Sequence, residues 1–205
     1  MRTFHYTYPS PLAGFENLPP LPDQRAENAN GEDGHVNPSH VNGVPYSNPP
    51  YVNPQRDERS DAYDKFTEPL NNGRRGGFDV HIYYKQNNKA QSQYAKELWE
   101  RIRREFPELR IYTFWEKPVG PHPFAMFEVD VLSPEQFGAF VPWLAIWRGP
   151  LSVLIHPNTV ASGDHDGRDG MTTRQREARD HSERAIWMGE RVPVDLDPFG
   201  DRHSY

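Results

Sequence analysis

The sequence of 205 residues contains no cysteine. This absence excludes a disulfide framework, thiolate zinc sites and a cysteine nucleophile. It fits a reducing compartment, so we expect a cytoplasmic protein. Long apolar runs are also missing, because no stretch approaches the roughly 18 consecutive apolar residues that a membrane span needs. The N-terminal residues lack the apolar core of a secretory signal. We therefore expect no membrane partner.

The charge balance argues against a nucleic-acid role. The chain has 23 Lys and Arg against 29 Asp and Glu, a formal net charge of −6, whereas phosphate binding requires a basic face. The densest basic group lies on a predicted helix, where acidic neighbours favour a solvated, ion-paired face: Arg101, Arg103 and Arg104 among Glu97, Glu100 and Glu105. We expect no nucleic-acid partner.

Apolar residues are scarce and unevenly distributed. They make up 35% of the chain, which also has 21 prolines and 15 glycines. From Glu27 to Asn72, Asn, Pro, Gly, Ser and Asp dominate, and such a segment cannot bury enough apolar surface to offset its ordering entropy. The sequence therefore predicts a low-complexity, disordered arm over residues 1–75 and a folded domain over residues 76–200.

Within the predicted domain, hydrophobic periodicity indicates strands and helices in the order β-α-β-β-α-β. Period-2 alternation predicts a strand over 78–84, and i, i+4 spacing predicts a helix over 90–106 that Pro107 ends. Ser133, Pro134 and Gln136 are typical of a helix start. The remaining strands are predicted over 109–115, 125–132 and 151–156.

This order is that of the ferredoxin-like arrangement. We expect an α+β fold with a four-stranded antiparallel sheet and two helices on one face. The other face stays open in this arrangement, and the C-terminal segment is available to cover part of it. An open face or edge is also compatible with a homodimer.

Strand parity brings candidate metal ligands to the open face. Alternate residues of a strand face opposite sides of a sheet. If Val80 and Ile82 face the helices, His81 faces the other way. The same argument places His156 and Glu128 on that face, on the strands next to that of His81. Two imidazoles and one carboxylate have the composition of the facial triad of non-haem Fe(II) oxygenases.

Each candidate has a plainer alternative. A lone strand histidine is more often structural, and Glu128 can pair with a cross-strand Lys or Arg. His122, in a Pro-Gly-Pro-His-Pro-like turn, is either a competing third ligand or an exposed turn residue. His181 follows Asp180 and is a candidate for acid–base catalysis or ligation. The remaining histidines are interpreted as solvated: His5, His35, His40, His165 and His203.

Several motifs occur together in this order: Asp79–Tyr84, Lys117–Pro123, Met126–Val129, Phe140–Leu144, Arg148–Thr159, and Asp180-His181 with Trp187 and Gly189. Together they resemble the DOPA 4,5-dioxygenase family of fungi and bacteria. The resemblance runs from about Phe78 to Leu196.

The resemblance implies Fe(II)-dependent extradiol cleavage of DOPA or a related catechol by O₂. It carries the family's histidines over to His81, His122, His156 and His181. Together with strand parity, this leads us to expect His81, His122 and His156 as metal ligands and His181 and Glu128 as catalytic residues. The alternative is a non-catalytic small-molecule-binding or accessory protein with the same fold.

Two departures from the family bear on the site. Some relatives have His-x-His in the first strand, where this chain has Asp79 and His81. The segment 160–179, interpreted as a loop to about Glu177, is also longer than the usual link and would reshape the pocket entrance.

Overall fold

The structure, a computed structural model, divides the chain into two units, residues 1–58 and 59–205. It describes residues 10–12, 14–21, 23–24, 40–41, 44–45, 51, 53–54, 57–73, 76–160 and 171–199. In the first unit, the strands β1 (His40–Val41) and β2 (Val44–Pro45) pair antiparallel. Most of the predicted arm lies outside the described residues, so its disorder stays a prediction.

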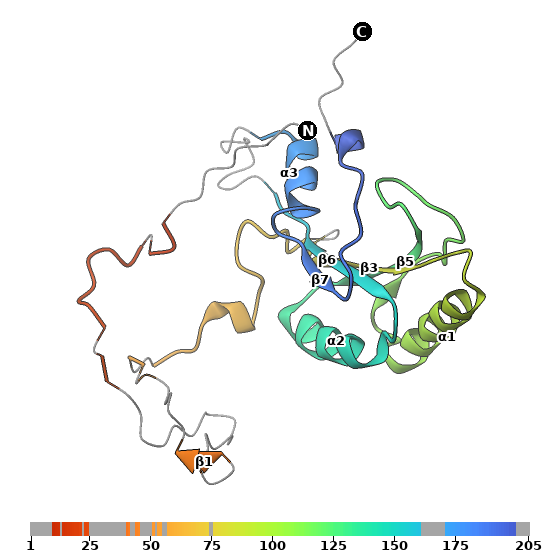
Figure 1. Ribbon diagram of the computed structural model, residues 1–205. Coiled ribbons are helices and arrows are strands. Elements are labelled where there is room, and N and C mark those ends of the chain that lie inside the picture. The colour runs from red at the N-terminus through yellow and green to blue at the C-terminus, as the bar shows by residue number, and fades with distance from the viewer. Residues whose placement is uncertain are drawn as a thin grey trace. The chain divides into compact units, whose positions relative to one another are not determined.

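A five-stranded antiparallel sheet forms the centre of the second unit (Figure 1). Its order is β4-β5-β3-β6-β7. The prediction of four strands was wrong by one, because the C-terminal segment adds β7 beside β6. The strands are β3 (Phe78–Tyr84), β4 (Arg110–Ile111), β5 (Ala125–Val131), β6 (Ser152–Pro157) and β7 (Ile186–Met188).

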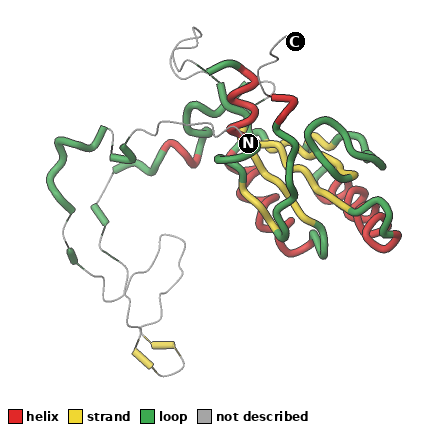
Figure 2. The backbone as a smooth tube through the Cα atoms, turned by 45° about the horizontal axis from the view of Figure 1, so that its top comes forward, coloured by secondary structure: helices red, strands yellow, loops and turns green. Residues whose placement is uncertain are grey.

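Two long helices cover one face of the sheet, as expected. They are α1 (Lys89–Glu105) and α2 (Pro134–Trp147), capped by Asn88 and Ser133. Figures 1 and 2 show a third helix, α3 (Thr173–Asp180), on the opposite side of the sheet. Among the described residues, no helix is both long and apolar enough to cross a membrane.

The main core lies between the sheet and the two long helices. It confirms the predicted parity, since Val80 and Ile82 are fully buried there. Burying a side chain of this size contributes about 1.5–3 kcal/mol, so a one-residue slip of β3 would expose the whole set. The partners from the other elements include Leu98, Ile102, Phe127, Val129, Phe140, Leu144, Val153 and Ile155.

A smaller core lies on the other face. Its buried members are Tyr83, Met126, Leu154 and Val192. Segments from the turn after β4 and from the C-terminal region pack against them: Val119, Phe124, Ala185, Trp187 and Val194. The C-terminal segment therefore covers part of the face that the topology alone leaves open.

The packed unit begins before residue 76, the boundary that composition predicted. Phe66 is 8% exposed and its ring lies edge-on to that of Phe78, 5.3 Å between centroids. The backbone of Asn71 bonds to Asn158 and Gly77. Ahead of them is the short helix η1 (Asp61–Tyr63). One aromatic anchor and a few backbone bonds order this segment despite its polar composition.

Gly77 provides a test of how tightly β3 is fixed at its start. Its φ is +78°, and a Cβ there would lie 2.0 Å from the backbone oxygen of Val131. We predict that Gly77→Ala lowers the free energy of unfolding by more than about 2 kcal/mol. Urea denaturation measures this.

Gly138 is the matched control. It lies in α2 and has nothing within 4 Å of the added Cβ, so Gly138→Ala should raise the free energy of unfolding by up to about 1 kcal/mol. If the two substitutions shifted stability in the same direction, the close approach at Gly77 would not be what fixes the strand.

Candidate functional site

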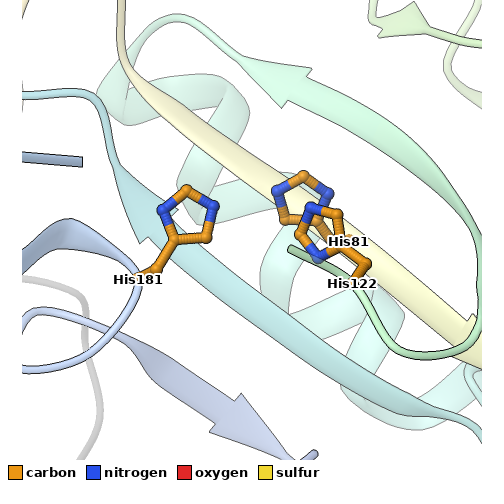
Figure 3. Close-up of side chains that lie close together, drawn as sticks. All are labelled: His81, His122 and His181. Atoms are coloured by element: carbon orange, nitrogen blue, oxygen red, sulfur yellow. The ribbon is translucent and has the colours of Figure 1, made fainter. Parts of the chain in front are cut away.

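Four histidines lie together on the face opposite α1 and α2. They come from β3, the turn before β5, β6 and the end of α3, and Figure 3 shows three of them. Ring centroids are 4.2 Å apart for His81 and His122, 5.1 Å for His81 and His156, and 3.9 Å for His156 and His181. Segments far apart in sequence therefore build one imidazole cluster.

Different local structures place these rings. His81 and His156 reach the site by strand parity, because β3 pairs with β6 in a register that sets Asp79 opposite His156. His122 closes a turn in which its backbone N–H bonds to the Val119 oxygen at 3.1 Å. His181 is the C-cap of α3.

The Nε2 atoms of His81 and His156 are 3.0 Å apart. Two metal–imidazole bonds of about 2.1 Å at right angles place their nitrogens about 3.0 Å apart. The spacing therefore suits two adjacent ligands of one octahedral metal ion. Both rings also lie on one face of the sheet, as strand parity predicted.

Hydrogen bonds to backbone carbonyl oxygens fix the tautomer of two of the four histidines. The Nδ1 of His156 lies 3.0 Å from the carbonyl oxygen of Pro157, and that of His181 lies 2.9 Å from the carbonyl oxygen of Glu177. Since a carbonyl only accepts, Nδ1 carries the proton and Nε2 keeps its lone pair. The Tyr83 hydroxyl bonds to Nδ1 of His122 at 2.7 Å. Histidine ligands of metals commonly have such supporting partners.

Burial keeps the four imidazoles neutral at pH 7. It lowers the pKa of His122 and of His156 to about 4 and that of His181 to about 3. The pKa of His81 lies well below its usual value for the same reason, and the neighbouring imidazoles add to the effect. Neutral imidazoles are the form that binds a metal.

Two carboxyl groups border the cluster. Glu128 Oε2 is 3.5 Å from Nδ1 of His81, and Asp79 Oδ2 is 3.9 Å from Nε2 of His156. Burial raises the pKa of Glu128 to about 8 and that of Asp79 to about 7, with neighbouring carboxylates adding to it. Nδ1 of His81 is buried and has no hydrogen-bond partner. This donor set fits a divalent ion that prefers imidazole, and Fe(II) is one.

The structure brings all five predicted site residues together. His122 is 6% exposed, which excludes the exposed-turn alternative, and Glu128 faces His81 rather than a cross-strand Lys or Arg. Among the described residues, three groups suit a metal geometrically. Two contain His81: His81, His122 and His181; and Asp79, His81 and His156; the third is Asp79, Glu128 and Asp130. Of the other histidines, His40 is described only by its backbone, and His5, His35, His165 and His203 lie outside the described residues.

Some parts of the site escaped sequence reasoning. The segment predicted as a loop to about Glu177 contains α3, and its start has a capping box between Thr172 and Gln175 that could have revealed it. The bond between Tyr83 and His122 and the ring of Phe199, 5.0 Å from that of His181, had no sequence signal. Residues 161–170 of the predicted insertion lie outside the described residues.

Asp180 fixes the end of α3 that carries His181. It is 4% exposed and accepts hydrogen bonds from the Thr159 backbone at 3.0 Å and the Thr159 hydroxyl at 2.8 Å. The Arg184 guanidinium pairs with it at 2.9 Å. Because Thr159 follows β6 directly, these bonds tie the helix end to the strand of His156.

A cavity of about 440 Å³ lies next to the cluster. Tyr83 belongs to both, because its ring lines the cavity while its hydroxyl bonds to His122. None of the four histidines lines it. The lining includes aromatic, apolar and charged side chains: Tyr84, Lys85, Phe124, Glu190, Arg191 and Pro193.

The fold and the site define an α+β protein with a buried imidazole cluster suited to a metal ion. The chain belongs to the Dopa 4,5-dioxygenase family, whose model matches residues 78–198. It is therefore a member of a dioxygenase family.

Three proteins of known sequence or structure are similar to this chain. An uncharacterized 21.2 kDa protein of Botryotinia fuckeliana is 56% identical over 191 residues, 93% of this chain and 90% of that protein. The DOPA 4,5-dioxygenase of Amanita muscaria is 35% identical over 121 residues, 57% of this chain and 46% of that protein, so the match spans about half of the Amanita enzyme. A crystal structure from Nostoc punctiforme, provisionally described as a dioxygenase, has 27% identity, a TM-score of 0.45, and coverage of 60% of this chain and 89% of that one.

The pKa shifts predict how the stability of the metal-free protein depends on pH. The depressed histidine pKa values contribute stability that is lost as pH falls from about 6.5 towards about 4. The raised pKa values of Asp79 and Glu128 contribute stability that is lost as pH rises towards about 7 and 8. Where the two pH ranges overlap, the stability that four histidines gain with rising pH exceeds the stability that two carboxyls lose. We therefore expect maximal stability near pH 6.5.

Chemical denaturation in the presence of EDTA across pH 4.5–8.5 measures this profile. Glu128→Gln should flatten the decline on the alkaline side and steepen the rise on the acidic side, because the opposing contribution of the Glu128 carboxyl is lost from both. An alkaline decline of the same slope in that variant would contradict the assignment to Glu128.

The Asp180 contacts predict a stability difference. Asp180→Asn should lower the free energy of unfolding by about 1–3 kcal/mol, because the buried charge that Arg184 pairs with is lost. It should also shift the NMR resonances of the His181 ring. The control Glu177→Gln changes an exposed side chain whose backbone oxygen still serves His181 and should stay within about 0.5 kcal/mol of the wild type. Equal effects of both substitutions would contradict the role of Asp180.

Proposed function

We propose that this chain is a non-haem Fe(II)-dependent extradiol dioxygenase that cleaves the ring of DOPA or a related catechol with O₂. The observation that carries the proposal is the convergence of four neutral imidazoles on one sheet face in a member of the Dopa 4,5-dioxygenase family.

In this proposal His81, His122 and His156 hold the ion, with His181 beside them. A ferrous ion held by these residues would supply the redox chemistry of catechol ring opening by dioxygen. Tyr83 and the carbonyl oxygen of Pro157 orient the rings of His122 and His156. Such supporting partners sharpen ligand geometry and raise ligand basicity.

Two residues are available for proton transfer. His181 presents an unprotonated Nε2, because its Nδ1 donates to the backbone oxygen of Glu177. This Nε2 can accept a proton from a catechol hydroxyl. The Glu128 carboxyl has a pKa raised to about 8, so at neutral pH it can donate one. A proton acceptor and a proton donor therefore both lie near His81.

The adjoining cavity favours an amino-acid catechol over catechol itself. Its volume of about 440 Å³ lies in the range usual for small-molecule sites. Its aromatic side chains, Tyr83, Tyr84 and Phe124, suit a ring. Lys85 and Arg191 complement a carboxylate, and Glu190 complements an ammonium group.

Anaerobic reconstitution tests the proposal. We expect the protein, loaded with Fe(II) and then given DOPA and O₂, to consume oxygen and form a yellow ring-opened product. Oxygen electrode traces and visible spectra follow the two. Bound iron without oxygen uptake on any catechol would refute the activity and leave an accessory, small-molecule-binding role.

A substitution at Glu128 tests its role as an acid. Glu128→Gln should lower kcat by a factor of about 10²–10⁴ while iron content stays the same. The control Glu135→Gln removes the charge of an exposed glutamate in the first turn of α2 and should leave kcat unchanged. An unchanged kcat in the Glu128 variant would exclude the carboxyl from proton transfer.

A further inference from the structure

Three carboxyl groups gather next to the imidazole cluster, on the same sheet face. Asp79 in β3 lies directly opposite Asp130 in β5, and Glu128 lies opposite His81. One oxygen of each carboxyl lies within 4.8 Å of one oxygen of the other two. The antiparallel register and strand parity thus bring three acids to one place.

Hydrogen bonds hold one oxygen of two of these carboxyls and leave the other available. Asn158 Nδ2 donates to Asp79 Oδ1 at 2.7 Å, and the Tyr112 hydroxyl donates to Asp130 Oδ2 at 2.6 Å. Carboxylates that ligate a metal are commonly held by such outer partners. The pattern orients the acids without neutralising them.

Two buried polar atoms at this place have no partner. Asp130 is 7% exposed, and its Oδ1 is buried without a hydrogen bond. His81, which is not one of the acids, is 3% exposed, and its Nδ1 is also without a hydrogen bond although it lies 3.5 Å from Glu128 Oε2. A buried polar group without a partner is costly, and a cation held by the three carboxyls would satisfy Asp130 Oδ1.

We propose that Asp79, Glu128 and Asp130 form a second metal site, which binds a hard divalent cation such as Mn²⁺. Oxygen ligands suit such cations, whereas the imidazole cluster suits iron. His81 separates the two sites, with Nε2 towards His156 and Nδ1 towards Glu128. This site goes beyond the proposed dioxygenase activity, and Glu128 can serve as the acid of that activity only while the cation is absent.

Metal counting on the full chain tests the second site. The chelator-treated protein is loaded with one equivalent of Zn²⁺ for the imidazole cluster and then dialysed against Mn²⁺. We expect one Zn²⁺ and one Mn²⁺ per chain by mass spectrometry of the metals, with the bound Mn²⁺ visible by EPR. One metal in total per chain would overturn the proposal.

Two variants separate the sites. Asp130→Asn should weaken Mn²⁺ binding at least tenfold and leave Zn²⁺ content unchanged, whereas His122→Ala should do the reverse. Glu135→Gln, an exposed carboxyl elsewhere, is the control and should change neither. Equal loss of both metals in Asp130→Asn, in a protein with wild-type circular dichroism, would show a single shared centre and overturn the proposal.

Tyr112→Phe decides the question if Asp130→Asn does not fold. It removes only the hydroxyl that holds Asp130 Oδ2 and keeps all three carboxyls. We expect Mn²⁺ affinity to fall severalfold, towards the about tenfold typical of lost outer partners, with Zn²⁺ unchanged. An unchanged Mn²⁺ affinity would overturn the assignment of Asp130 as a ligand.

Discussion

The packing of β3 against the two long helices is the constraint on which the site depends. Val80 and Ile82 are fully buried on that face, and a strand cannot bury them without turning its alternate residues the other way. The central position of β3, between β5 and β6, then gives those alternate residues neighbours on both sides. The hydrophobic core therefore fixes the relative positions of His81, Glu128 and His156, although none of them belongs to it.

This arrangement also buries polar groups, which is energetically unfavourable for their charged forms. Four imidazoles and three carboxyls share this sheet face, and burial shifts the pKa values of the imidazoles, Glu128 and Asp79 towards the neutral forms. Neutral imidazoles with Nδ1 bonded to carbonyl oxygens, as for His156 and His181, are prepared for a metal at Nε2. The burial that disfavours a charged imidazole therefore also keeps the neutral form that a metal binds.

Sequence reasoning succeeded where the period-2 alternation of a strand decides which face of the sheet a side chain is on. Alternation in three strands placed His81, His156 and Glu128, because each strand is long enough to show it. It failed for β7, which has three residues, and for the start of the unit, where Phe66 and a few backbone hydrogen bonds anchor a polar segment. His122 and His181 lie in a turn and at a helix end, whose positions depend on tertiary contacts such as those of Asp180 with Thr159. No local pattern contains that information.

His81 connects the two halves of the site. Each of its ring nitrogens faces a different chemistry, imidazole at His156 and carboxylate at Glu128. A neutral imidazole carries one proton, so one nitrogen donates while the other is a lone pair. Nε2 of His156 accepts, because Nδ1 of that ring is committed to Pro157; in the metal-free protein His81 therefore donates from Nε2 and turns the lone pair of Nδ1 towards Glu128. A metal bound by both Nε2 atoms needs the opposite tautomer, in which Nδ1 carries the proton and donates towards Glu128. Metal binding at the two Nε2 atoms would thus change, through this one ring, the hydrogen bonding of the carboxyl beside it.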